Sequence, residues 1–457
     1  MRSAHVKSVS SLGALVALAA FSLALLAPAV ASAWSGQLVW ARGVEIGLAD
    51  EGFADLARGP GGSVYAVGWA NYAAGNGDLL VAKFSAAGRP LWRKVYDGPA
   101  HGDDVGSAIA VDAAGNAYVT GSSESLLNGD DAITLKYSSA GTKLWSRRYN
   151  GMADDYDVGV DVALDGAGRA YVAMTSTVMG GKNIVVVKYG PGGGRTWEAM
   201  WAGPGDDDYA RAIAVDAQGS AYVVGAANTF TTGQDAVILR LTVAGSVKWS
   251  KMYDGAAGLS DWGAALMVRG NYVYLMGVST RAGGRFSFLA AKYGRTAGGL
   301  KWARVSDVAG DVATTAGVWV DGDGNVTVGG DLAVTGPALK RGAVVSWNRY
   351  GVFRWSKTWW ARATDEPASF SAMTGNSAGD LYLAGWMGRG TAHDSVVVKY
   401  HKDGSKAWAR PFNSDPYESA VAGCLLLTGG SSGGLHAGGT LSVGGLSYSA
   451  LILKYRP

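Results

Sequence analysis

The stretch AITLKYSSAGTKLWSRRY, residues 132–149, carries the pattern on which the whole chain is built. An apolar run ends in Lys136 and Tyr137, a turn of small residues follows, and Gly141 stands four positions before Trp145. The same Gly-x-x-x-Trp step occurs eight times, at Gly36/Trp40, Gly88/Trp92, Gly141/Trp145, Gly193/Trp197, Gly245/Trp249, Gly298/Trp302, Gly351/Trp355 and Gly404/Trp408. Consecutive tryptophans are 52 or 53 residues apart. This regular spacing predicts a tandem array of structural repeats.

Each repeat has the sequence signals of four short β-strands. In the second repeat, residues 107–111 (SAIAV) and 117–120 (AYVT) flank the turn sequence DAAGN. Asp can bond its own backbone in such a turn, and Gly supplies a positive φ. Residues 132–137 and 144–149 supply the third and fourth strands, separated by a second short turn. With no helical period after the N-terminal leader, the pattern predicts an all-β fold.

The composition of the strands predicts their order. The first strand of each repeat is built on Ala, Val and Ser, which suits strands that crowd around a central axis. The fourth carries Trp, Tyr, Arg and Lys, and basic side chains at an outer edge discourage pairing with other molecules. Four-stranded sheets repeated around an axis form a β-propeller of about four to eight blades.

The strand count predicts how the ring closes. The first three strands each occur eight times, and the last set ends at Tyr455. A fourth-strand sequence, residues 36–40 (GQLVW), stands ahead of the first complete repeat. An open solenoid would need polar capping repeats, and neither end shows one. We therefore predict an all-β, eight-bladed β-propeller of four-stranded antiparallel blades, closed by the N-terminal strand pairing into the last blade.

The N-terminus has the features of an export signal. Arg2 and Lys7 precede the uncharged apolar residues 12–30, and Ala-Ser-Ala at 31–33 is an A-x-A cleavage signature. An uncleaved anchor is the alternative, because the apolar run approaches the ~20 residues of a membrane span. The cleavage signature favours a signal peptide over residues 1–33 and one propeller domain over residues 34–457. We expect a secreted or periplasmic monomer with no membrane insertion after signal removal.

Charge balance and cysteine content argue against a nucleic-acid partner and against an intrachain disulfide. The chain has 40 basic residues, two of them in the leader, which leaves 38 against 37 acidic residues. This balance argues against a nucleic-acid partner held by bulk charge. The single cysteine, Cys424, excludes an intrachain disulfide.

The repeat resembles a known family. The unit AIAVDAAGNAYVTGSS…DAITLKYSSAGTKLWSRRYNG resembles the bacterial secreted β-propeller repeat, or SBBP repeat, and the resemblance extends over residues 37–455. The Gly-x-x-x-Trp turn is also similar to the tryptophan-docking repeat of pyrroloquinoline-quinone propellers. The first resemblance implies an exported propeller and supplies no catalytic residues. A quinone-dependent enzyme of the second class would be expected to carry a vicinal cysteine pair, which a chain with only Cys424 lacks.

Positions shared by nearly all repeats are expected to hold blades together, so the eight repeat tryptophans are interpreted as structural. A site is expected where one blade departs from the pattern. The connections within a repeat from second to third strand, and those between repeats, vary in sequence and lie on one face, which we call the loop face. The short standard turns lie on the opposite turn face. Variable loops on a rigid scaffold are where recognition is usual.

The loop face is predicted to be acidic before each first strand, in AHGDDVG, MADDYDVG, GPGDDDYA and LSDWG. Hard cations such as Ca²⁺ take several oxygen ligands. The candidate Ca²⁺ ligands are Asp104, Asp157, Asp207, Asp208 and Asp261. The alternative is that these carboxylates accept backbone hydrogen bonds. The sequence indicates no other cofactor.

Non-repeated aromatic residues suggest a ligand site on this face. They are Tyr156, Tyr209, Trp262, Trp69 and Trp386. Aromatic rings beside carboxylates suit sugars, although they can equally pack loops against neighbouring blades. We expect a non-enzymatic binding or scaffold propeller whose partner is a glycan or a cell-surface protein. The alternative is a glycan-acting hydrolase or lyase using loop-face carboxylates; because no catalytic constellation is recognisable, the sequence leans against an enzyme.

Overall fold

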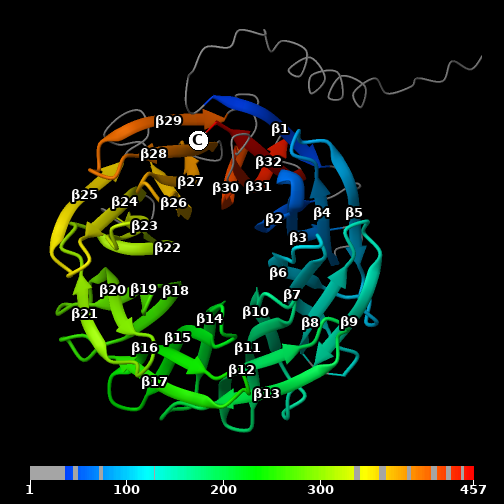
Figure 1. Ribbon diagram of the computed structural model, residues 1–457, viewed down its shortest axis with the longest axis horizontal. Helices are drawn as coiled ribbons and strands as arrows, with labels where there is room; N and C mark the ends of the chain where they lie inside the picture. Colours follow the sequence, from blue (N-terminus) through cyan, green and yellow to red (C-terminus); the bar gives the residue numbers. More distant parts are fainter. Residues whose placement is uncertain are drawn as a thin grey trace, which may run out of the picture.

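The computed structural model describes residues 37–44, 50–71, 76–127, 129–333, 340–359, 367–388, 393–412, 419–428, 434–443 and 447–456. These residues form eight four-stranded antiparallel sheets around a common axis (Figure 1). The predicted eight-bladed β-propeller is therefore confirmed. The predicted signal peptide lies outside the described residues, so its cleavage stays a prediction. Within the described ranges there is no helix of the length and apolarity that a membrane crossing requires.

Each blade has four strands. Blade 1 is β2 (Glu51–Arg58), β3 (Val64–Asn71), β4 (Gly77–Phe84) and β5 (Pro90–Tyr96); blade 2 is β6 (Asp104–Val111), β7 (Ala117–Glu124), β8 (Asp130–Tyr137) and β9 (Lys143–Tyr149); blade 3 is β10 (Asp157–Leu164), β11 (Ala170–Val178), β12 (Gly181–Tyr189) and β13 (Arg195–Trp201); blade 4 is β14 (Asp208–Val215), β15 (Ala221–Thr229), β16 (Gly233–Leu241) and β17 (Val247–Tyr253). Blade 5 is β18 (Asp261–Arg269), β19 (Tyr272–Thr280), β20 (Phe286–Gly294) and β21 (Leu300–Val305); blade 6 is β22 (Asp311–Val320), β23 (Val326–Ala333), β24 (Lys340–Trp347) and β25 (Phe353–Trp359); blade 7 is β26 (Ala368–Gly375), β27 (Leu381–Met387), β28 (Asp394–Tyr400) and β29 (Lys406–Phe412); blade 8 is β30 (Ser419–Thr428), β31 (Gly434–Val443), β32 (Ser447–Tyr455) and β1 (Leu38–Val44). A 3₁₀ turn, Pro60–Gly62, joins β2 to β3.

Within each blade the strands follow one another from the axis outward, so that the first strand is innermost and the fourth lies at the rim (Figure 1). They extend further toward the loop face than the apolar pattern indicated: β6 begins at Asp104, and β7 continues past Gly121. The ladder is continued by polar pairs such as Asp104 opposite Ser123. Gly121 allows the close approach of β6, because a Cβ there would lie 1.8 Å from the carbonyl oxygen of Val105.

The repeat tryptophans dock each blade onto the next. The Trp92 indole N–H donates to the carbonyl oxygen of Ser139 in the neighbouring blade at 3.1 Å, and the ring lies against Gly141. Gly141 has a φ of 83°, and a Cβ there would lie 2.9 Å from the indole. The Gly-x-x-x-Trp step therefore has two functions, since its Gly receives one tryptophan while its own Trp docks onto the next blade. This confirms the structural interpretation of these residues.

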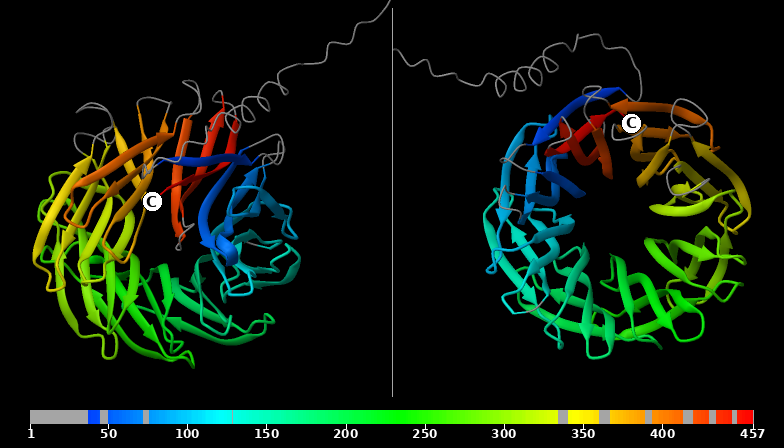
Figure 2. Two further views of the ribbon diagram at one scale, coloured as in Figure 1. Left: turned by 45° about the horizontal axis from the view of Figure 1, so that its top comes forward. Right: turned by 180° about the vertical axis from the view of Figure 1, so that it is seen from behind.

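The N-terminal strand closes the ring. β1 pairs antiparallel with β32, from Leu38 opposite Tyr455 to Val44 opposite Ala450, and supplies the fourth strand of blade 8 (Figure 2). The Trp40 ring packs against Gly88 of blade 1, where a Cβ would lie 2.5 Å from the indole. The contact between blade 8 and blade 1, which we call the seam, therefore has the same tryptophan–glycine docking as the other blade contacts.

One residue at the seam departs from the repeat. His436 in β31 is aligned with Tyr118, and each lies opposite a Lys of the third strand. The Tyr118 hydroxyl donates to the carbonyl oxygen of Gly168 in the next blade. His436 is fully buried beside Trp40, with ring centroids 5.6 Å apart, and neither of its ring nitrogens has a hydrogen-bond partner among the described residues. Burial, with a smaller contribution from the charge of Lys454, lowers the pKa of His436 to about 3.

We expect the seam to weaken in acid. Because the folded pKa of His436 lies below its ordinary value of 6.5, protonation favours the unfolded chain. The stabilisation is complete above pH 6.5 and is lost toward pH 3, at up to about 1.4 kcal/mol per pH unit. In denaturant titrations from pH 7 to pH 4, His436→Tyr should lose less unfolding free energy than wild type. Equal losses in both proteins would show that His436 does not govern acid stability.

Candidate functional site

Most predicted loop-face residues lie in strands. Asp104, Asp157, Asp208 and Asp261 are the first residues of β6, β10, β14 and β18. Tyr209 and Trp262 follow two of them, while Trp69 and Trp386 lie in the second strands β3 and β27. Tyr156 alone of the five aromatics is in a connection, between β9 and β10. The expectation that the acidic residues are loop carboxylates was wrong for these four, because the strands extend further toward this face.

The four strand-initial aspartates have a structural contact in common. Each is almost fully buried and accepts the backbone N–H of a glycine just after the preceding blade. The donor–acceptor pairs are Gly98–Asp104 at 2.6 Å, Gly151–Asp157, Gly203–Asp208 and Gly255–Asp261. Desolvation raises the pKa of Asp208 to about 6. These carboxylates hold the connection between one blade and the next by accepting backbone hydrogen bonds, which was the alternative to Ca²⁺ binding.

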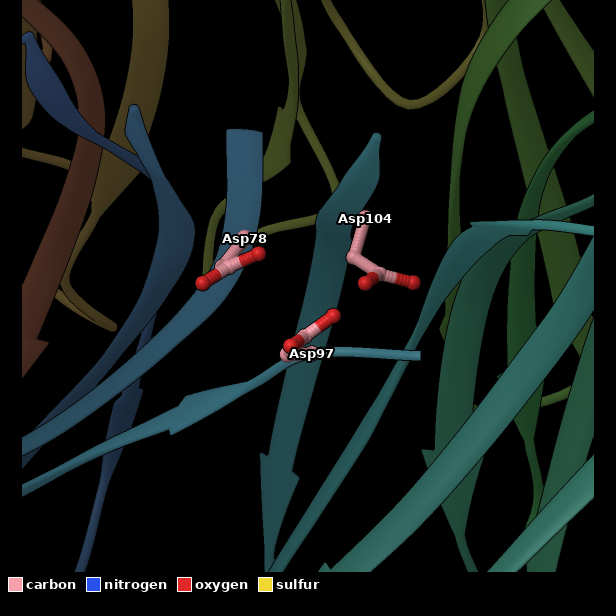
Figure 3. A group of neighbouring side chains, drawn as sticks. All are labelled: Asp78, Asp97 and Asp104. Atoms are coloured by element: carbon pink, nitrogen blue, oxygen red, sulfur yellow. The ribbon is translucent and has the colours of Figure 1, made fainter. Parts of the chain in front are cut away.

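Two of these aspartates also belong to carboxylate triads. Asp78 at the start of β4, Asp97 after β5 and Asp104 place one oxygen each within 4.8 Å of the others (Figure 3). Burial, followed by the charges of Asp97 and Asp104, raises the pKa of Asp78 to about 6. The equivalent residues of blade 4 and the start of blade 5 form the second triad, Asp235, Asp254 and Asp261. Either triad offers oxygen ligands of the type that Ca²⁺ takes.

In blade 2 the aspartate at the position of Asp78 has a basic partner. Asp131, which is aligned with Asp78, forms an ion pair with Arg148 at 2.9 Å. Blades 1 and 4 have Val95 and Met252 at the position of Arg148. In blade 2 the guanidinium of Arg148 therefore pairs with the carboxylate of Asp131. The two triads have no arginine at the equivalent position.

Tyr209 belongs to a polar cluster between blades 3 and 4. Its hydroxyl donates to Asp207 at 3.3 Å, and the ammonium group of Lys182 lies 5.4 Å from its ring centroid. The backbone N–H of Lys182 donates to the carbonyl oxygen of Asp206 at 2.9 Å, which joins the start of β12 to the connection between β13 and β14. Lys182 was not predicted, because only the cross-blade pairing places it beside Tyr209.

The other predicted aromatics are packed to different degrees. The Tyr156 side chain is 56% exposed, although its carbonyl oxygen accepts from Thr177. Trp262 is half-buried in an edge contact with Phe286, at 5.4 Å between centroids. Trp69 lies over Gly52, and Trp386 contacts the ring of His393 at 4.3 Å. The structure therefore does not gather the five aromatics into one site.

A set of exposed apolar side chains lies in the loop-face connections of blades 2 to 5. It comprises Leu126 (71% exposed), Leu127 (73%), Met152 (80%), Met179 (89%), Phe230 (73%) and Leu259 (40%), together with Tyr156. We call these seven residues the apolar loop surface. Exposed carboxylates lie in other connections of the loop face, Asp103 before blade 2 and Asp206 before blade 4. Sequence analysis missed this surface because single apolar residues in loops have no periodicity.

Two further carboxylates lie in the innermost strands. Asp55 accepts the backbone N–H of Ile109 in the next blade at 2.9 Å, and Asp161 accepts that of Ile213 at 2.8 Å. Desolvation raises the pKa of Asp55 to about 7 and that of Asp161 to about 6. Their second oxygens accept the N–H of the following residue. These contacts join neighbouring inner strands and give both residues a structural function.

Comparisons with known proteins agree with this architecture. Residues 98–128 match the model of the SBBP family, described as a beta-propeller repeat, which confirms the resemblance. A europium-containing methanol dehydrogenase is similar in structure, with a TM-score of 0.54 at 10% identity over 92% of this chain and 93% of that chain. The WD40 domain of SCAP from fission yeast gives a TM-score of 0.49 at 8% identity, over 91% of this chain and 98% of that chain. At such identities the likeness concerns the fold alone. A search of the curated proteins found no match.

Proposed function

We propose that this β-propeller is an exported binding scaffold and that its apolar loop surface binds a protein partner. The observation that carries this proposal is the apolar loop surface itself, where Met152, Met179 and Phe230 are each at least 73% exposed. Large apolar side chains that are exposed on one face of a scaffold are candidates for an interaction site, and protein interfaces are enriched in Met and aromatic residues. The neighbouring carboxylates favour a partner segment in which apolar side chains are flanked by Lys or Arg.

A glycan is the alternative ligand. Tyr209 supports it, because its half-buried ring lies beside Asp207 and Lys182, and such a group can stack on a sugar and bond its hydroxyls. This cluster is smaller than the apolar loop surface, and so we favour the protein partner.

Selection from a random peptide library against the chain beginning at Trp34 tests the proposal. Enriched peptides should combine apolar and basic residues, and Met152→Ser with Phe230→Ser should weaken their binding at least tenfold. Tyr350→Ser is the matched control, because Tyr350 is 65% exposed in a turn between β24 and β25 on the opposite face. If selection gives no peptide while a glycan array gives a ligand whose binding requires Tyr209, the glycan alternative replaces the proposal.

The carboxylate triads predict a response to Ca²⁺. Three neighbouring carboxylates repel one another, and a divalent cation that binds only the folded state raises stability by about 2.7 kcal/mol at one hundred times its Kd. Millimolar Ca²⁺ should therefore raise the melting temperature more than NaCl of equal ionic strength. Asp97→Asn with Asp254→Asn should abolish the difference, whereas Asp206→Asn should not. Equal shifts with both salts would show that the triads do not bind Ca²⁺ specifically.

A glycan-acting hydrolase or lyase remains the second candidate function. The first triad favours it, because burial raises the pKa of Asp78 to about 6 beside the exposed carboxylate of Asp97. A carboxylic acid that holds its proton near neutral pH beside a second carboxylate is the pairing that glycosidases use. Reducing-end assays on a polysaccharide panel test this candidate, and absence of product across the panel would remove it.

A further inference from the structure

The fourth strand of a blade usually ends in an aromatic residue that packs toward the next blade. Six blades have this residue, namely Tyr96, Tyr149, Trp201, Tyr253, Trp359 and Phe412. In blade 2, Tyr149 is 7% exposed and belongs to the core shared with blade 3. Its hydroxyl donates to Glu198, the residue after the repeat Trp197, at 3.2 Å. The aromatic ring thus fills the outer space between neighbouring sheets.

Blade 5 has Ser306 at this position. Tyr149 lies opposite Ala132 in the ladder, and the residue aligned with Ala132 in blade 5 is Phe288. The backbone N–H of Ser306 donates to the carbonyl oxygen of Phe288 at 2.9 Å, so the pairing is the same. The Ser306 hydroxyl turns inward and accepts the N–H of Phe288 at 3.2 Å. No aromatic ring therefore projects from this position toward blade 6.

A cavity of about 420 Å³ lies at the place of the missing ring. Its apolar wall is formed by Val305 at the end of β21, by Val308 in the connection after it, and by Val345, Trp347 and Phe353 of blade 6. Its polar lining includes Arg304, Ser306, Asp307 and Ser356. The volume falls within the ~300–1,000 Å³ range of small-molecule sites. Ser356 follows the repeat Trp355, as Glu198 follows Trp197. A hydroxyl group is therefore available where the Tyr149 phenol has its partner in blade 2.

The rim of the cavity is exposed and is joined by polar contacts. Phe353 is 58% exposed, and the exposed Asp307 forms an ion pair with Arg281 at 2.5 Å. Arg281 also donates to the carbonyl oxygen of Ser306. The guanidinium of Arg304 donates to the carbonyl oxygen of Gly351 at 2.7 Å, and this bond joins the two blades within the lining of the cavity. The walls are thus held in place without the ring that fills the equivalent space elsewhere.

We propose that the cavity between blades 5 and 6 is a binding site for a small, neutral, single-ring phenol. Valine side chains and the rings of Trp347 and Phe353 supply an apolar, aromatic-lined space, and the Ser356 hydroxyl lies where a phenol hydroxyl can be bonded. A preformed cavity with an aromatic and apolar wall and a few polar groups at its edge is the usual form of a small-molecule site, and here it lacks the ring that most of the other blades supply. This site is on the outer wall and is independent of the apolar loop surface.

Calorimetric titration of the chain beginning at Trp34 with p-cresol tests the proposal. We expect saturable binding with a Kd of about 1 mM or tighter, within the efficiency of small ligands. Ser306→Tyr places a ring in the cavity and should weaken p-cresol binding at least tenfold while raising the melting temperature. Ser356→Ala should reduce the preference for p-cresol over toluene at least threefold.

The repeat offers a matched gain-of-function variant. Tyr149→Ser removes the ring between blades 2 and 3 and should create a second p-cresol site, giving two sites per chain. If Ser306→Tyr does not fold, Val345→Trp blocks the same cavity and serves in its place. Absence of p-cresol binding by wild type, or undiminished binding by a folded cavity-filling variant, would overturn the proposal. If aromatic peptides bind to the cavity and p-cresol does not, the proposal is overturned as well, because the cavity would then receive the side chain of a protein partner.

Discussion

Removal of residues 34–44 is expected to lower the melting temperature by about 10 °C or more, or to cause aggregation. The deletion removes β1, leaves β32 as an unpaired strand edge, and takes Trp40 away from Gly88. Loss of one large buried side chain alone costs about 3–5 kcal/mol, and each kcal/mol corresponds to about 2–4 °C in a large domain. Exposed strand edges also pair with other molecules. Differential scanning calorimetry with light scattering measures both effects.

The control for this deletion is a chain that begins at Ser35. That chain keeps all of β1 and the Gly36/Trp40 pair, so we expect it to unfold like the chain that begins at Trp34. If the chain without residues 34–44 melts like the control and stays monomeric, β1 contributes little and the ring does not depend on it for closure.

The second large effect is expected for Trp145→Ala, which should lower the free energy of unfolding by about 3–5 kcal/mol. Trp145 is 8% exposed, its indole N–H donates to the carbonyl oxygen of Pro191 at 3.0 Å, and its ring lies against Gly193. Truncation removes the docking of blade 2 onto blade 3. Chemical denaturation followed by fluorescence gives the free energy.

Trp262→Ala is the comparison for the repeat tryptophans. Trp262 is half-buried and makes its ring contact with Phe286, so its truncation should cost about 1 kcal/mol, the typical value for point mutations. Equal losses for Trp145→Ala and Trp262→Ala would contradict the assignment of the repeat tryptophans to blade docking.

The fold could be predicted because one residue pair repeats. The spacing of Gly141 and Trp145 recurs in every blade, and among the described residues the Gly of one pair receives the Trp of the preceding pair at seven blade contacts. The strand count placed β1 in the last blade for the same reason. Strand ends were less predictable, because polar pairs such as Asp104 and Ser123 extend the ladder without an apolar signal.

The candidate sites could be predicted only in part. Asp104 and Asp261 were recognised from their loops, but their partners Asp78 and Asp235 lie in third strands and become neighbours only through sheet register. Ser306 could have been found from the sequence, because it follows Trp302 by four positions, as Tyr149 follows Trp145. The sequence could not show the consequence. The pairing of Ser306 with Phe288 confirms the equivalence of the position, and only the structure shows the cavity beside it.

The most direct test of the proposed function is hydrogen–deuterium exchange of the chain beginning at Trp34, with and without a peptide selected against it. We expect slower exchange in the loop-face connections that contain Met152, Met179 and Phe230. The standard turns on the opposite face, such as the one at Gly115, should exchange at unchanged rates. Protection of the turn face, or no protection in the connections of blades 2 to 5 at saturating peptide, would contradict the assignment of the apolar loop surface as the binding site.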